Sequence, residues 1–181
     1  MPTSLRSARL LGLFVFLAGC STMPAQPPLE TVQRVELNRF MGDWYVIASI
    51  PTFIEKDAFA AVESYALNPD GTVATTFTFR KGALDGPLKR YTPKGFIIDT
   101  TTNATWGMRF IWPIKAEYLI LDLAPDYSTT IIGRNKRDYV WIMARKPQLT
   151  DEEYAALLRK VVAYGYDAGN VRKVPQPPAA S

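Results

Sequence analysis

The alternation of hydrophobic and polar residues between positions 42 and 146 predicts a succession of short β-strands. Turn sequences such as NPDG, LDGP and NKRD separate eight runs that are rich in β-branched and aromatic residues. The runs are DWYVIASI, AAVESYAL, TVATTFTFRK, KRYTPKGFIID, ATWGMRFIW, AEYLILDL, STTIIGRN and YVWIMAR. This spacing is typical of an antiparallel barrel or sandwich.

One face of several runs is bulky and largely apolar, because every second residue is large. These faces comprise Val73, Thr75, Phe77 and Phe79; Trp106, Met108, Phe110 and Trp112; and Tyr139, Trp141, Met143 and Arg145. The opposite faces also carry apolar residues, among them Ile111, Val140 and Ile142. Some of the outer surface must therefore be covered by another element.

A helix is predicted after the last strand, in the segment TDEEYAALLRKVVAYGYD. Thr150 and Glu153 have the spacing of a capping box, and Gly165 stands where a helix commonly ends. An apolar stripe at helical spacing contains Tyr154, Leu157, Leu158, Val161 and Val162. We expect this stripe to pack on the outside of the sheet.

The N-terminus has the pattern of a secretory signal, with two arginines before the apolar run LLGLFVFLA. A transmembrane helix needs about 20 apolar residues, and this run is much shorter. We expect residues 1–19 to be removed and residues 20–33, which contain three prolines, to form a semi-extended tether. Residues 34–175 then form the domain, and residues 176–181 a flexible tail. The alternative is a soluble secreted protein in which Cys20 has no role.

Composition excludes several classes of function. The net charge is +4, and without Arg6 and Arg9 it falls to +2, from 19 basic and 17 acidic residues. No other basic run indicates nucleic-acid binding. The chain has no histidine and one cysteine, so Ser-His-Asp and Cys-His catalysis and an intrachain disulfide are impossible. Paired carboxylates such as Glu63 with Asp99 give no specific signal. We therefore expect neither an enzyme nor a metal or cofactor site.

Three segments resemble the signatures of the lipocalin family: RFMGDWYVIA, YLILDLAPDYSTTIIG and DYVWIMARKP. The matching positions are Gly42, Trp44 and Tyr45, then Asp126 and Tyr127, then Arg145. The resemblance spans roughly residues 34–175 and implies an all-β fold, an eight-stranded antiparallel up-and-down barrel with one C-terminal α-helix packed outside. It also implies that Trp44, Tyr127 and Arg145 close one end of the barrel, whereas Tyr45 packs outside.

The segment LAGC resembles the lipobox of bacterial lipoproteins, which implies that the thiol of Cys20 carries a lipid. With this feature the chain is most similar to the outer-membrane lipocalins of bacteria. In the enterobacterial sorting rule, a residue other than aspartate after the cysteine favours the outer membrane, and here that residue is Ser21. The resemblance thus implies a protein that is anchored in the outer membrane and faces the periplasm.

Lipocalins carry small hydrophobic molecules, and the bacterial group is associated with fatty acids and lysophospholipids. The residues expected to line the cavity are Tyr65, Phe77, Phe79, Trp106, Met108, Phe110, Tyr118, Trp141 and Met143. The basic residues that could meet a lysophospholipid headgroup are Arg80, Lys81, Lys89 and Arg109. Two alternatives stay open at this point: that the aromatic residues only fill a core, and that the domain binds other envelope components instead of a small molecule. The oligomeric state is also open.

Overall fold

Most strands pair antiparallel with the next strand in the chain, and the last long strand returns to the first. The computed structural model describes residues 26–178, so that Cys20, the expected signal and residues 179–181 lie outside it. The elements are α1 (Leu37–Phe40), β1 (Gly42–Ile50), β2 (Ala58–Leu67), β3 (Val73–Lys81), β4 (Leu88–Tyr91), β5 (Lys94–Ile97), β6 (Thr105–Ile111), β7 (Ile114–Leu123), β8 (Thr129–Gly133), β9 (Val140–Ala144), α2 (Asp151–Ala163), the short 3-10 helix η1 (Ala168–Asn170) and β10 (Arg172–Lys173).

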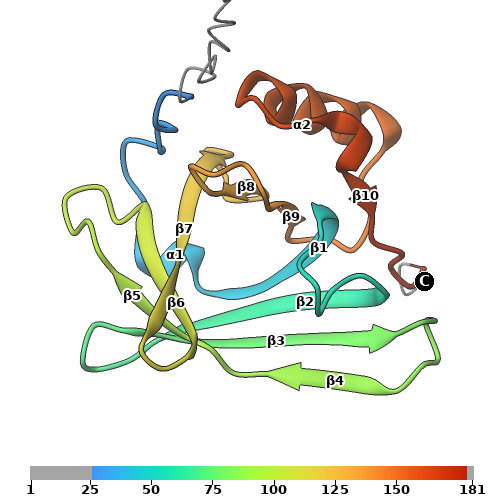
Figure 1. Ribbon diagram of the computed structural model, residues 1–181, viewed down its shortest axis with the longest axis horizontal. Coiled ribbons are helices and arrows are strands. Elements are labelled where there is room, and N and C mark those ends of the chain that lie inside the picture. The colour runs from blue at the N-terminus through green and yellow to red at the C-terminus, as the bar shows by residue number, and fades with distance from the viewer. Residues whose placement is uncertain (1–25, 179–181) are drawn as a thin grey trace, which may run out of the picture.

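The barrel closes where β1 pairs with β9, and its strands follow the chain order (Figure 1). β4 and β5 are two halves of the fourth strand, since both pair with β3. They are interrupted at Thr92 and Pro93, because proline has no N–H to donate to a neighbouring strand. The fold is therefore the predicted eight-stranded antiparallel barrel with a C-terminal helix outside.

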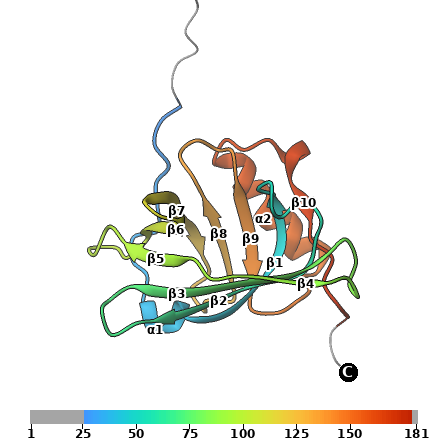
Figure 2. The same ribbon diagram turned by 60° about the horizontal axis from the view of Figure 1, so that its bottom comes forward.

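The helix α2 lies against the outer face of the barrel next to β9 (Figures 1 and 2). Thr150 and Glu153 form the predicted capping box. Leu157 and Val161 are buried against an outer layer that includes Val140 and Ile142, so the helix covers the apolar outward positions at this side. The cover is partial, as expected: Ile111, among the outward apolar positions, and Val162, at the edge of the helical stripe, stay exposed.

The C-terminal segment completes the barrel wall beside β1. β1 pairs with β2 only over residues 42–45, and β10 pairs with β1 at Ala48 and Ser49. Farther along, the side-chain amide nitrogen of Gln176 donates to the carbonyls of Val46 at 2.9 Å and Ala61 at 3.0 Å. The expected flexible tail thus starts with a residue that bridges two strands.

The segment before the barrel is also fixed on it. Arg137 donates to the carbonyl of Pro27 at 2.8 Å, and the N–H of Leu29 donates to Asn135 at 2.6 Å. The N–H of Val32 then donates to the carbonyl of Ile120 at 3.0 Å. The sequence predicted a tether through residue 33, whereas residues 27–32 lie along the barrel. No helix within residues 26–178 has both the length and the apolar character needed to span a bilayer.

Candidate functional site

One end of the barrel is closed by the side chains of Trp44 and Arg145. The indole is fully buried, and its N–H donates to the carbonyl of Phe40 at 2.8 Å. The guanidinium of Arg145 lies over the indole, 3.8 Å from the ring centroid. Gly42 has a φ of +92°, a conformation that L side chains rarely adopt, and this turn carries the chain under the guanidinium. Tyr45 lies on the other face, in the outer apolar layer.

Asp126 and Tyr127 form the turn between β7 and β8 at the same end. The carboxylate of Asp126 accepts from the N–H of Ser128 at 3.0 Å. The hydroxyl of Tyr127 accepts from the N–H of Glu36 at 2.9 Å, and Arg39 lies 4.0 Å over its ring. These contacts hold α1 across the barrel end. The opposite end carries the β1–β2, β3–β4, β6–β7 and β8–β9 loops, and we call it the open end because no helix of the described residues crosses it.

The interior of the barrel is lined by aromatic and sulfur-containing side chains. Of the nine residues that the sequence proposed as lining, eight belong to the interior apolar cluster: Tyr65, Phe77, Phe79, Trp106, Met108, Tyr118, Trp141 and Met143. Phe40, from α1, and Tyr91, from β4, join them. Contact of these residues with a ligand remains a prediction.

Phe110 is not part of this cluster, which corrects the sequence expectation. Its side chain is 51% exposed, near the tip of the β6–β7 hairpin. Met108 pairs with Ala116 and Ile111 pairs with Ile114, so β6 holds one extra residue between these pairs. Such a bulge breaks the strict in-and-out alternation on which the prediction depended.

A polar group lies among the interior aromatic residues, on β2 and β7. The hydroxyl of Tyr65 donates to the carboxyl of Glu63, and it lies 2.6 Å from the hydroxyl of Tyr118. Because Tyr65 gives its only proton to Glu63, Tyr118 is the donor in the second bond. Glu63 pairs with Trp44 across β1 and with Phe77 across β3, and both partners face inward. Its carboxyl therefore faces the interior.

Burial changes the acidity of this group. It raises the pKa of Glu63 to about 7, although the hydrogen bond from Tyr65 acts in the opposite direction and the negative charge of Glu55 adds to the increase. Burial likewise raises the pKa of Tyr65 and Tyr118 well above the usual value for tyrosine. Both hydroxyls thus remain protonated donors, and Glu63 changes its charge near neutral pH.

Glu55 reaches the interior from the β1–β2 loop, at the open end. Its carboxylate accepts from the indole N–H of Trp141 at 2.9 Å and from the N–H of Thr52 at 2.8 Å. A hollow of about 400 Å³ lies beside it, between this loop and residues 172–175. The loop and the C-terminal segment together border this part of the opening.

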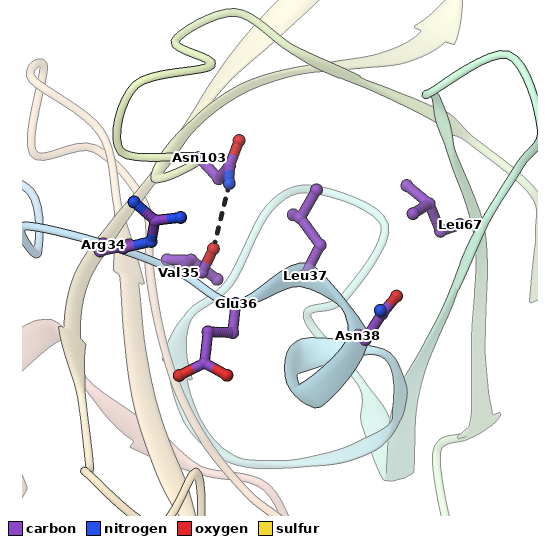
Figure 3. A pocket seen from close by; sticks show the side chains of 7 residues that line it. All are labelled: Arg34, Val35, Glu36, Leu37, Asn38, Leu67 and Asn103. Atoms are coloured by element: carbon purple, nitrogen blue, oxygen red, sulfur yellow. Dashed lines mark hydrogen bonds between the residues drawn. The ribbon is translucent and has the colours of Figure 1, made fainter.

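A second hollow, of about 350 Å³, lies outside the closed end (Figure 3). Polar side chains surround Leu37 and Leu67 there, and Asn103 donates to the carbonyl of Val35 at 3.1 Å. The hollow is wide open, and its polar lining holds no buried atom without a partner. We therefore place the candidate site inside the barrel.

The sequence did not single out Glu63 as a binding residue, although it stands two positions from Tyr65 and so shares its face. Asp99, which the sequence offers as a possible partner of Glu63, instead accepts from the N–H of Thr101 and the hydroxyl of Thr102 in the β5–β6 loop. Within residues 26–178, no three histidine, cysteine or acidic side chains gather in a group that could hold a metal. The interior thus combines a large apolar cluster with one polar group formed by Glu63, Tyr65 and Tyr118.

Comparison with known proteins agrees with this geometry. A family model described as a lipocalin-like domain matches residues 35–176. Temperature-induced lipocalin-1 of Arabidopsis thaliana is 32% identical over 166 residues, which cover 85% of this chain and 86% of the plant protein. Outer membrane lipoprotein Blc of Escherichia coli is 24% identical over 163 residues, with 89% and 90% covered. Among solved structures, insecticyanin of Manduca sexta has a TM-score of 0.65 at 18% identity, covering 85% of this chain and 87% of insecticyanin.

Proposed function

Because this chain belongs to the lipocalin family, whose members are generally ligand-binding carriers and not enzymes, we propose that it carries one single-chain lipid inside its barrel. The ligand is a fatty acid or a lysophospholipid, held for storage or transport in the cell envelope. The observation that supports this proposal is the interior cluster of aromatic and methionine side chains, which lies next to the end closed by Trp44 and Arg145. Apolar pockets with a few polar groups are the usual form of small-molecule sites.

The energetics favour an acyl chain. Burial of about fourteen methylenes contributes roughly 11 kcal/mol at about 0.8 kcal/mol each. Loss of ligand freedom and ordering of the chain offset several kcal/mol of this gain. The expected affinity is micromolar or tighter. Methionines such as Met108 and Met143 adapt to an irregular chain because their side chains are unbranched and flexible.

The strand register narrows the choice of cations for a headgroup at the mouth. Lys89 pairs with Phe79 and Lys81 pairs with Ala58, and both partners face inward. Directly paired residues share one face of a sheet, so the register places both lysines on the inner face, at the exposed rim. Arg109 instead lies 4.7 Å from the ring centroid of Phe96, on the outer face. A phosphate or carboxylate at the mouth is thus expected to meet Lys81 and Lys89.

The same proposal includes a lipid anchor on Cys20 in the outer membrane, facing the periplasm. Support comes from the lipobox and from relatives that are named outer membrane lipoproteins in Escherichia coli, Citrobacter freundii and Vibrio cholerae. Since residues 27–32 are held on the barrel, only residues 20–26 can separate the anchor from the domain. Seven extended residues span at most about 25 Å, so the barrel stays close to the membrane.

The direct test is native mass spectrometry of the protein after gentle extraction from its own membrane, followed by lipid titration with tryptophan emission as the signal. We expect a co-purifying single-chain lipid, and a blue shift or quenching from Trp106 and Trp141. An empty protein whose emission does not respond to fatty acid or lysophospholipid would contradict the carrier proposal. That result would favour a lipid-tethered domain that binds other envelope components.

A further inference from the structure

The only charged side chains buried within the described residues are two glutamates, and both reach the barrel interior. Glu55 and Glu63 are each 9% exposed, and no lysine or arginine belongs to the buried class in residues 26–178. Glu55 has three hydrogen bonds, including the one from Trp141. Glu63 has only the one from Tyr65, and no cation among the described residues pairs with it. A buried carboxylate without a counter-charge is costly, and a cation offsets that cost.

Aromatic rings lie near this carboxyl group. Trp106 stacks on Tyr118 with centroids 5.4 Å apart, and Tyr65 and Trp106 form a T-shaped pair with centroids 5.8 Å apart. Phe77 lies opposite Glu63 across the β2–β3 pair. The faces of aromatic rings attract cations, and ammonium groups are commonly held by aromatic cages. Negative charge and ring faces therefore favour the same kind of ligand.

Thr75 adds an independent sign of a missing partner. Its side chain is 3% exposed, and its hydroxyl has no hydrogen-bond partner among the described residues. Thr75 pairs with Tyr65 across β2 and β3, so it lies on the inner face beside the tyrosine. A buried hydroxyl that lacks a partner in this position can bond to a polar group of a ligand.

We propose that Glu63, Tyr65, Tyr118 and Thr75 form a polar subsite in the barrel that receives the ammonium end of a long-chain amphiphile. The inference rests on the proposed carrier function and defines which end of the ligand enters first. The ammonium lies against Glu63 and the neighbouring rings, and the alkyl chain extends along Phe77, Phe79 and Met108 toward the mouth. A fatty acid binds in the opposite orientation, with its carboxylate outside near Lys81 and Lys89.

The test compares dodecylamine, dodecanol and dodecanoic acid, which share one chain length, in titrations of the full chain. At about pH 8.5 we expect the amine to bind about tenfold more tightly than the alcohol. At about pH 6 this preference falls about tenfold, because Glu63 is protonated there. The Glu63→Gln variant loses the preference at both pH values. The exposed Glu152 provides the matched control, so Glu152→Gln keeps it.

The outcomes separate the two proposals. If the three ligands bind equally in the wild-type protein, or if Glu63→Gln retains the preference for the amine, the subsite is wrong and the carrier function stands. If none of the three binds, the carrier function fails, and the subsite with it. The comparison of the three ligands in the wild-type protein tests the subsite without depending on whether a variant folds. Tyr118→Phe, which removes one hydroxyl and keeps the ring, provides a second variant, with an expected weakening of amine binding of several-fold.

A second inference concerns the open end and rests on different residues. Seven of the ten exposed large apolar side chains of the described region lie on or beside the three loops that connect β1–β2, β3–β4 and β6–β7. They are Phe53, Leu84, Leu88, Phe110, Ile111, Trp112 and Ile114. Because neighbouring strands are antiparallel, these three loops lie at one end of the barrel. We call these residues the apolar rim.

The path of the N-terminal segment leads to the same end. The N–H of Val35 donates to the carbonyl of Thr102 at the closed end, whereas Pro27 and Leu29 are held by the β8–β9 loop at the open end. The chain that leads back to Cys20 therefore departs from the open end. Basic side chains flank the rim, including Lys81, Lys89 and Lys115.

We infer that the apolar rim docks on the surface of a lipid bilayer, with the open end of the barrel facing the membrane. Tryptophan and aliphatic side chains enter the boundary between headgroups and acyl chains, and lysines attract anionic headgroups. A ligand then passes between bilayer and barrel without crossing water. The short chain to Cys20 places its lipid in the same bilayer.

The test reconstitutes the protein in vesicles of phosphatidylcholine and phosphatidylglycerol whose acyl chains carry bromine, which quenches nearby tryptophan. We expect quenching of the wild-type emission, a marked loss of quenching in Trp112→Phe, and weaker vesicle binding in Ile111→Asp. The control Val162→Asp changes an exposed apolar residue of α2 and should have no effect. Equal quenching in the wild type and Trp112→Phe would overturn the docking proposal.

Discussion

The guanidinium of Arg145 covers the indole of Trp44 at 3.8 Å and donates to four backbone carbonyls in residues 39–43, at 2.7–3.0 Å. One side chain after the last long strand thus fixes both the segment that enters the barrel and the tryptophan that closes it. Planar geometry is essential here, because five N–H groups in one plane can serve several acceptors together.

Arg145→Lys keeps the charge and removes this planar array of donors. We expect it to lower the free energy of unfolding by about 2 kcal/mol, since four backbone carbonyls lose their donor, two of them partly buried. Urea denaturation measures this change. The exposed Arg159 on α2 is the matched control, and Arg159→Lys should have little effect. Equal stability of Arg145→Lys and wild type would show that the closed end does not depend on the guanidinium.

Trp44→Ala removes a fully buried ring from the closed end. Truncation of a large core side chain costs about 3–5 kcal/mol, so we expect a large decrease in Tm. Trp112, which is 78% exposed, gives the control for loss of a tryptophan. Trp112→Ala should leave Tm almost unchanged, and a similar Tm for Trp44→Ala would contradict its role as a plug.

Glu63 makes stability depend on pH in a defined direction. Its pKa in the folded protein, about 7, is higher than the ordinary value of 4.5, so the folded state holds a proton that the unfolded chain releases. The contribution of this proton to the free energy of unfolding is therefore fully present below pH 4.5. It is lost as the pH rises to about 7, which lowers the free energy of unfolding by up to about 3 kcal/mol. Glu63→Gln should remove this decrease and be more stable than wild type at pH 8.

Denaturation midpoints from acidic to mildly alkaline pH test this prediction. Glu152→Gln is the control and should retain the wild-type slope. Hydrogen bonds lower the pKa values of Asp70 and Asp99 below the ordinary value of 3.8. Their contribution to stability is therefore lost only at more acidic pH, outside the range in which Glu63 titrates. The difference between Glu63→Gln and wild type thus isolates the buried carboxyl. Parallel curves for the two proteins would show that Glu63 is ionised at no cost.

Cys20→Ala tests the anchor. If the thiol carries the lipid, the variant should stay unprocessed or become soluble, whereas the wild type should sediment with outer membranes. Mass spectrometry of the mature N-terminus identifies the acylated cysteine. Ser21→Ala is a control that leaves the thiol in place. Outer-membrane fractionation of Cys20→Ala with unchanged cleavage would show that another feature holds the protein there.

Much of the fold followed from local patterns. Alternation over short runs predicted the strands, and Thr150 with Glu153 predicted the start of the helix, because both signals depend only on neighbouring residues. Three motifs predicted the closed barrel. The alternation failed at Phe110, where one extra residue in β6 changed the register. A bulge depends on pairing with the next strand, and no local pattern in β6 shows it.

The sequence by itself determined the strand order, the helix and the aromatic character of the inner faces, since these depend on residue type and spacing. Only the tertiary structure connected Glu63 of β2, through the hydroxyl of Tyr65, to Tyr118 of β7, 55 positions away in the chain. It also showed that the buried charged side chains of residues 26–178 are both glutamates and that the segment before the barrel runs to the open end. The charge of the barrel interior and the path of the N-terminal segment depend on contacts between residues that are distant in the chain. Packing of the closed barrel determines these contacts, and local spacing in the sequence does not.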